Sequence, residues 1–155
     1  GSAAATGDPH LQNIHGERFD LLQSGKHVLI NIPRKERRAS RVLLRVDAEA
    51  QRLGGQCADI YFQELNITGA WAEVKQTGGF SFHSRDVGEK YAHWLRFGNV
   101  QLKVAHGHTT RGVKYLNFYV KNLRRAGHDV GGLLGEDDHT QEEQSSKACV
   151  RRLAL

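Results

Sequence analysis

Hydrophobic alternation with a period of two residues constrains this chain more than any other feature of its sequence. The alternating segments are separated by glycine-rich turns, whereas an amphipathic helix would repeat about every 3.6 residues. We expect strands at residues 19–22, 27–32, 41–48, 58–67, 71–76, 80–83, 93–105 and 112–121. Many short strands divided by turns predict an all-β fold, an antiparallel β-sandwich or barrel-like domain.

One segment, Thr140 to Leu155, favours a helix instead. Its acidic residues come early and its basic residues come late, an order that complements the helix dipole. These residues are Glu142, Glu143, Lys147, Arg151 and Arg152. The sequence therefore predicts a short C-terminal helix packed on the sheets.

The length of 155 residues fits a single domain, and the contents of 39% hydrophobic and 25% charged residues are ordinary for a soluble protein. No apolar run approaches the roughly 18 residues of a membrane-spanning helix, so we expect no transmembrane segment. Residues 1–6, Gly-Ser-Ala-Ala-Ala-Thr, read as an expression scar and linker. Residues 7–155 then form the single β domain.

Two distant segments carry the most distinctive motifs. The first, Gly7–Asp20, contains Gly-Asp-Pro-His followed by Gly-Glu-Arg-Phe, and the second, Val130–His139, begins Val-Gly-Gly-Leu-Leu-Gly. This pair resembles the opening and closing motifs of the von Willebrand factor type D domain, G-D-P-H-x-x-x-x-D-G-x-x-F and V-C-G-L-C-G-N-x-D-G. It is also similar to the C-terminal region of inter-alpha-trypsin inhibitor heavy chains. The resemblance implies an adhesion or assembly module of a larger secreted or surface protein, located outside the cell.

The resemblance also implies a calcium site. The type D ligand positions fall on His15, Glu136 and Asp138, with later ligands near Glu142 and Glu143. Carboxylate oxygens suit calcium, whereas imidazole suits zinc or another transition metal. Three alternatives stay open: weak calcium binding with His15 displaced by water, a transition metal held by His15 and carboxylates with His10 or His139, and a salt-bridged loop without metal.

The cysteines differ from the type D pattern. Gly131 and Leu134 replace both cysteines of the closing motif, which excludes covalent multimers formed through vicinal cysteines. The two cysteines that the chain does have, Cys57 and Cys149, are too few for a disulfide scaffold. Either they pair with each other, or Cys57 is a buried small hydrophobic residue.

The triplet Asn66-Ile67-Thr68 is an N-glycosylation sequon. A glycan on Asn66 requires that the chain is secreted, because the modification occurs in the secretory pathway. The sequence therefore predicts a glycoprotein if the chain is secreted.

Positive charge is concentrated in one short segment. The chain has a net charge of +5 and a sequence pI of about 9.4, and five cations lie within eight residues: Arg34, Lys35, Arg37, Arg38 and Arg41. Such a segment is either a solvated loop or a contact for a polyanion such as a sulfated glycan. No aromatic residue interrupts the segment, so base stacking is unsupported and nucleic acid is not the expected partner. We expect a protein or an acidic glycan.

Motifs of catalysis are missing from the sequence. It has no G-x-S-x-G elbow, phosphate-binding loop or dinucleotide fingerprint. His106 and His108 have the spacing of a metal-binding pair on one strand face, but the glutamate expected after them is missing, which favours an exposed hairpin tip. The sequence therefore predicts a non-catalytic interaction module. The alternative is a metal-dependent enzyme or lectin that uses histidine and carboxylate ligands on a β-sandwich.

Overall fold

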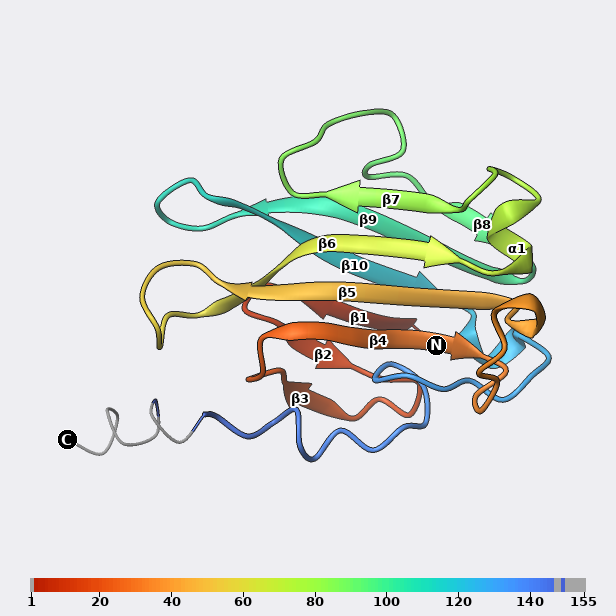
Figure 1. Cartoon of the computed structure of the whole chain (residues 1–155), viewed down its shortest axis with the longest axis horizontal. Helices are drawn as coiled ribbons and strands as arrows, with labels where there is room; N and C mark the ends of the chain where they lie inside the picture. Colours follow the sequence, from red (N-terminus) through yellow and green to blue (C-terminus); the bar gives the residue numbers. More distant parts are fainter. Residues whose placement is uncertain (1, 147–148, 150–155) are drawn as a thin grey trace.

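A computed structural model describes residues 2–146 and residue 149, and it shows a curled antiparallel sheet in the form of a half-barrel (Figure 1). The strands are β1 (Ser2–Thr6), β2 (His10–Gln12), β3 (Arg18–Asp20), β4 (Gly25–Ile32), β5 (Leu44–Arg52), β6 (Ile60–Thr68), β7 (Phe80–His83), β8 (Leu95–Phe97), β9 (Val100–His108) and β10 (Lys114–Lys121). Three short helical turns accompany them: η1 (Ala39–Arg41), α1 (Ala70–Glu73) and η2 (Leu123–Arg125). The all-β prediction is confirmed.

The sheet folds over itself into two layers. In Figure 1 the front layer runs β7-β6-β5-β4, and the back layer runs β8-β9-β10-β1-β2-β3. The layers join where Leu116 of β10 pairs with Phe62 of β6, and both side chains are fully buried. Alternate residues of each strand point into the space between the layers, because successive side chains of a strand face opposite sides. Most of the core therefore consists of apolar positions that the alternation marked.

Residues 2–6 belong to this core, so the prediction that they are a linker outside the fold is wrong. They form β1, which pairs with β10 on one side and β2 on the other. Ala3 and Ala5 are 4% and 0% exposed, respectively. Their small side chains hide the period-two pattern, because alanine contributes little to a hydrophobic alternation. The segment lies between two strands that come from opposite ends of the chain.

The predicted strand at residues 71–76 is also wrong. Most of this segment lies in the helical turn α1 and the turn that follows it, with Ala72 buried beneath the sheet. Gly69, just before α1, has a φ of +102°, and a Cβ there would lie 2.6 Å from the carbonyl oxygen of Leu43. The chain thus passes close against the backbone that precedes β5, and the Trp71 N–H donates to Leu43 O at 2.9 Å. This contact, which alternation cannot predict, holds the segment away from a sheet.

The predicted C-terminal helix does not begin at Thr140. Residues 140–146 are turns and coil that run beside β3, and the remainder of that helix lies outside the described residues apart from Cys149 (Figure 1). The Leu22 N–H donates to Glu142 O at 2.7 Å, and the Gln23 side chain donates to Gln144 O. These backbone groups therefore bind the β3–β4 connection instead of forming helical hydrogen bonds. Within the described residues no helix has the length and apolar character needed to cross a membrane.

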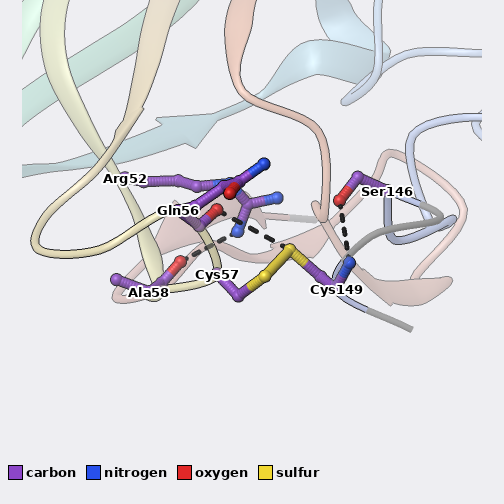
Figure 2. The surroundings of a disulfide bond; sticks show 6 residues. All are labelled: Arg52, Gln56, Cys57, Ala58, Ser146 and Cys149. Atoms are coloured by element: carbon purple, nitrogen blue, oxygen red, sulfur yellow. Dashed lines mark hydrogen bonds between the residues drawn. A yellow bond between two sulfur atoms is a disulfide. The ribbon is translucent and has the colours of Figure 1, made fainter. Parts of the chain in front are cut away.

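The two cysteines form an intramolecular disulfide, which settles the alternative that the sequence left open (Figure 2). Cys57 lies in the β5–β6 connection, and its Cα is 5.3 Å from that of Cys149 across a sequence separation of 92 residues. Cys149 is also bound by Ser146, whose hydroxyl and carbonyl both accept from its N–H. The bond ties Cys149 to the front layer.

Candidate functional site

The closing motif lies along the free edge of β4 as an additional, irregular strand. Gly131 and Asn31 exchange two backbone hydrogen bonds of 2.8 and 2.9 Å. The N–H groups of Leu133 and Leu134 donate to carbonyls of β4, Val28 O and Leu29 O, both at 2.9 Å. The two leucine side chains are buried in the core. The motif thus covers an edge that would otherwise present unpaired backbone groups to solvent.

Close backbone contact explains the glycines of this motif. Gly132 has a φ of +91°, and a Cβ at this position would lie 2.4 Å from Leu29 O. A Cβ at Gly135 would lie 2.4 Å from Val130 O. Only glycine can adopt the first conformation without strain, and neither site has room for a side chain. The glycine spacing is therefore a requirement of the fold and does not by itself indicate a ligand.

The opening and closing segments meet at what we call the motif seam, the contact between residues 13–17 and residues 134–143. The Ile14 N–H donates to Leu134 O at 2.8 Å, and the Arg124 guanidinium donates to Ile14 O at 2.9 Å. Asn13 is 2% exposed, and its side-chain oxygen accepts from the N–H groups of His15 and Glu17, both at 3.0 Å. Two segments more than a hundred residues apart thus form one rigid surface.

The seam brings together only part of the predicted calcium set. His15 Nε2 lies 3.7 Å from Glu136 Oε1, but Asp138 and Glu143 face different partners, and Glu142 is bound through its backbone carbonyl. Asp138 accepts from the hydroxyl and N–H of Thr140, which lower the pKa of its carboxyl group below the ordinary value. Glu143 binds His139 at 3.0 Å. Across residues 2–146 and 149, no three histidine, cysteine or acidic side chains are grouped as a metal would require.

Histidine–carboxylate pairs are instead the common feature of this region. His10 lies between Asp20, 2.6 Å from its Nδ1, and Asp8, 2.8 Å from its Nε2. The hydrogen bond and charge of Asp20, helped by Asp8, raise the pKa of His10 above its ordinary value. His139 stacks on the buried ring of Phe19, with centroids 3.7 Å apart, and also faces Glu17. These contacts are those of the salt-bridged loop, one of the three alternatives, and metal binding stays a prediction.

The five predicted polyanion-binding cations do not share one environment. Arg34 turns back to the motif seam, where its Nε donates to Asp137 Oδ1 at 2.9 Å and its Nη2 donates to Glu136 O at 3.0 Å. Its side chain is 34% exposed. The other four cations are exposed, and within the described residues none of them forms an ion pair: Lys35, Arg37, Arg38 and Arg41. We call these four residues the basic loop, which connects β4 to β5.

Two further predicted positions lie in strands. Asn66 lies near the end of β6, where its Nδ2 donates to Glu64 Oε1 and its Oδ1 accepts from Ser81 of β7. The sequon therefore lies in a strand and not in a loop, and a glycan stays a prediction. His106 is not at an exposed hairpin tip, because β9 continues to His108. The His106 ring stacks on Tyr91 with centroids 4.5 Å apart. The tip begins only after His108.

Comparison with known proteins gives no assignment: neither a protein-family model nor a curated protein matches this chain. The type D resemblance therefore stays an expectation based on the two motifs. Sequence reasoning missed Asp137, the partner of Arg34, because the type D pattern has no ligand at that position. It also missed the polar face of the late strands. The alternation in residues 93–105 and 112–121 could have indicated that face, because it places Lys103, Tyr119 and Lys121 opposite the buried positions.

Proposed function

We propose that this chain is a non-catalytic interaction module of a larger secreted or surface protein, and that its basic loop contacts an acidic protein or glycan. The single observation behind this proposal is the contrast within one short segment. Arg34 is bound to Asp137, whereas the four cations after it are exposed and unpaired among the described residues. Arg34 anchors the start of the loop, and the following cations are available to a partner.

Physical chemistry supports a contact role for such a loop. Neighbouring like charges repel, and a counter-charged partner relieves this repulsion and also accelerates encounter. The Arg38 N–H donates to the Glu36 side chain at 3.0 Å, and η1 follows directly, so the loop has local structure of its own. A loop that is partly ordered before binding loses less conformational entropy when a partner binds.

The test is charge reversal. We expect Arg37→Glu with Arg38→Glu to weaken binding to a heparin column or heparin oligosaccharides by about tenfold or more, and wild-type binding to fall steeply with salt. The matched control is Arg85→Glu with Arg111→Glu, which changes net charge equally in the β7–β8 and β9–β10 connections. Equal heparin affinity in the wild type and the basic-loop variant would reject the loop as the contact.

The predicted cation site is tested separately by thermal melts in EDTA, in calcium and in zinc. Because Glu136, Asp138 and Glu143 already have partners in the protein, we expect the same melting temperature in all three solutions. A rise specific to calcium that scales with its concentration by mass action would instead support the calcium site of the type D resemblance. A rise with zinc alone, removed by His15→Ala, would support the alternative of a metal-dependent enzyme or lectin.

A further inference from the structure

A second cationic surface lies on the outer face of the back layer, far along the chain from the basic loop. Lys121 Nζ lies 4.0 Å from the ring centroid of Trp94, and Lys103 Nζ lies 4.9 Å from the same centroid. Lys103 is also 4.9 Å from the ring of Tyr119, its cross-strand neighbour. We call these four residues the lysine–tryptophan cluster. Their rings fix the two ammonium groups through cation–π attraction.

The cluster holds two like charges together without a carboxylate to compensate them. Both ammonium groups lie beside one indole ring, and the strand register places Lys103 and Lys121 at diagonal positions on the same outer face of β9 and β10. Within the described residues neither lysine forms an ion pair. An indole ring attracts cations but carries no net charge. The arrangement therefore favours an anionic group placed between the two lysines.

The outer face of the back layer around the cluster is also positively charged. The outward positions of the back-layer strands contain four cations, Arg18, Arg96, Lys103 and Lys121, against the single carboxylate of Asp20. Asp20 is already bound to His10. Unlike the basic loop, this surface spreads its charge over several strands, so it suits a ligand of low charge density.

Beside the lysine–tryptophan cluster, the outer face presents small side chains and side-chain amides. Ala4 of β1 pairs with Tyr119 on one side and with Gln12 of β2 on the other, and Gln101 pairs with Lys121. A depression lies here, with Ala4, Thr6, Gln12 and Arg18 among its lining residues. Two carboxylates, Asp20 and Glu143, also line it, and they are paired with His10 and His139, respectively. Small residues leave room for a chain to lie across the strands, and amide side chains can bind hydroxyl groups.

We propose that this face binds an acidic polysaccharide whose uronate carboxylates are spaced along the chain. One carboxylate is bound between Lys103 and Lys121, the sugar rings lie across Ala4 and Thr6, and the amides contact hydroxyl groups. Single-stranded nucleic acid fits less well, because stacking a base on Trp94 would displace the ammonium groups that lie at its ring. This site goes beyond the proposed function and depends on different residues, so either proposal can fail alone.

The experiment measures binding of polygalacturonate oligosaccharides to the full chain by calorimetry. Lys103→Gln with Lys121→Gln should weaken this binding by about tenfold, since two charge-assisted contacts are lost. Lys103→Arg with Lys121→Arg keeps both charges and should bind within about threefold of the wild type. Arg85→Gln with Arg111→Gln removes the same charge from the β7–β8 and β9–β10 connections and should leave the affinity unchanged.

Several outcomes would overturn the inference. The wild type failing to bind polygalacturonate would do so, as would equal affinity in the wild type and the double glutamine variant. Tighter binding of a single-stranded oligonucleotide, lost in Trp94→Ala but kept in the double glutamine variant, would replace it with a stacking site. Loss of heparin binding in the basic-loop variant while polygalacturonate binding persists would instead support two separate sites.

Discussion

The motif seam and the basic loop are neighbours joined by Arg34, yet their charged groups are arranged differently. In the seam, His15 faces Glu136, Arg34 binds Asp137, and His139 faces Glu143. In the basic loop, Lys35, Arg37, Arg38 and Arg41 are exposed, and within the described part of the chain none has a carboxylate partner. The sequence predicted a functional site in both regions, a metal site in the seam and a polyanion contact in the basic loop.

The difference distinguishes structural charge from charge that is available to a ligand. A carboxylate already paired with a cation inside the protein has part of its charge compensated, so it attracts a metal less strongly. Exposed arginines that repel one another gain from any anion that approaches. The most distinctive motif of the sequence is therefore the more structural of the two regions, and the plainer basic segment is the better candidate for binding.

The contrast between the two regions is tested most strongly in the closing motif, where the backbone packs most closely against β4. Gly132→Ala should lower the free energy of unfolding by about 3 kcal/mol, because φ is positive and the new Cβ would collide with Leu29 O. Gly16→Ala is the control: its φ is also positive, but no atom lies within 4 Å of the added Cβ, so we expect a loss of about 1 kcal/mol. Chemical denaturation measures both, and equal losses would show that the docking of the motif adds no constraint.

A smaller effect is expected where the two regions meet. Arg34→Ala removes the bonds to Asp137 and to Glu136 O, so unfolding should become easier by about 1–2 kcal/mol while heparin binding changes little. Arg37→Ala should show the reverse, with stability within about 0.5 kcal/mol of the wild type and weaker heparin binding. If Arg34→Ala weakens heparin binding as much as Arg37→Ala does, the division of this segment into anchor and contact is wrong.

The smallest effect concerns pH. Asp20 and Asp8 raise the pKa of His10 in the folded chain, so protonated His10 stabilises the fold. This contribution is fully present below the unfolded pKa of about 6.5 and is lost as the pH rises through the higher folded value. His10 is 61% exposed, so the difference in stability between the wild type and His10→Gln should be below about 1 kcal/mol at pH 6 and should shrink by pH 9. A difference that grows with pH would contradict the assignment.

The strands with strong alternation were predictable, and the exceptions have local causes. Residues 27–32 and 80–83 become β4 and β7 nearly as expected, because their apolar side chains meet the core. Ser2–Thr6 was missed because alanines carry little hydrophobic signal, although Ala5 is fully buried. Residues 71–76 alternate but fold as a turn, since the close contact between Gly69 and Leu43 comes from another part of the chain.

The candidate site was predictable in composition but not in pairing. The sequence identified Glu136, Asp138 and the five cations by residue type and spacing alone. It could not show that Arg34 binds Asp137, a residue 103 positions away, or that Lys103 and Lys121 lie at the same indole ring. Such pairs depend on strand register, which local sequence does not specify.

By itself the sequence determined the β class of this protein, the positions of most strands and the glycines of the closing motif, because alternation and backbone freedom are local properties. The tertiary structure alone decided which charges are neutralised and which stay free. Electrostatic pairing depends on distances of a few ångströms between residues that are remote in the chain, and only the folded sheet sets those distances. The folded sheet also brings two motifs that are remote in the sequence into one seam, and it brings two lysines on adjacent strands into one cluster.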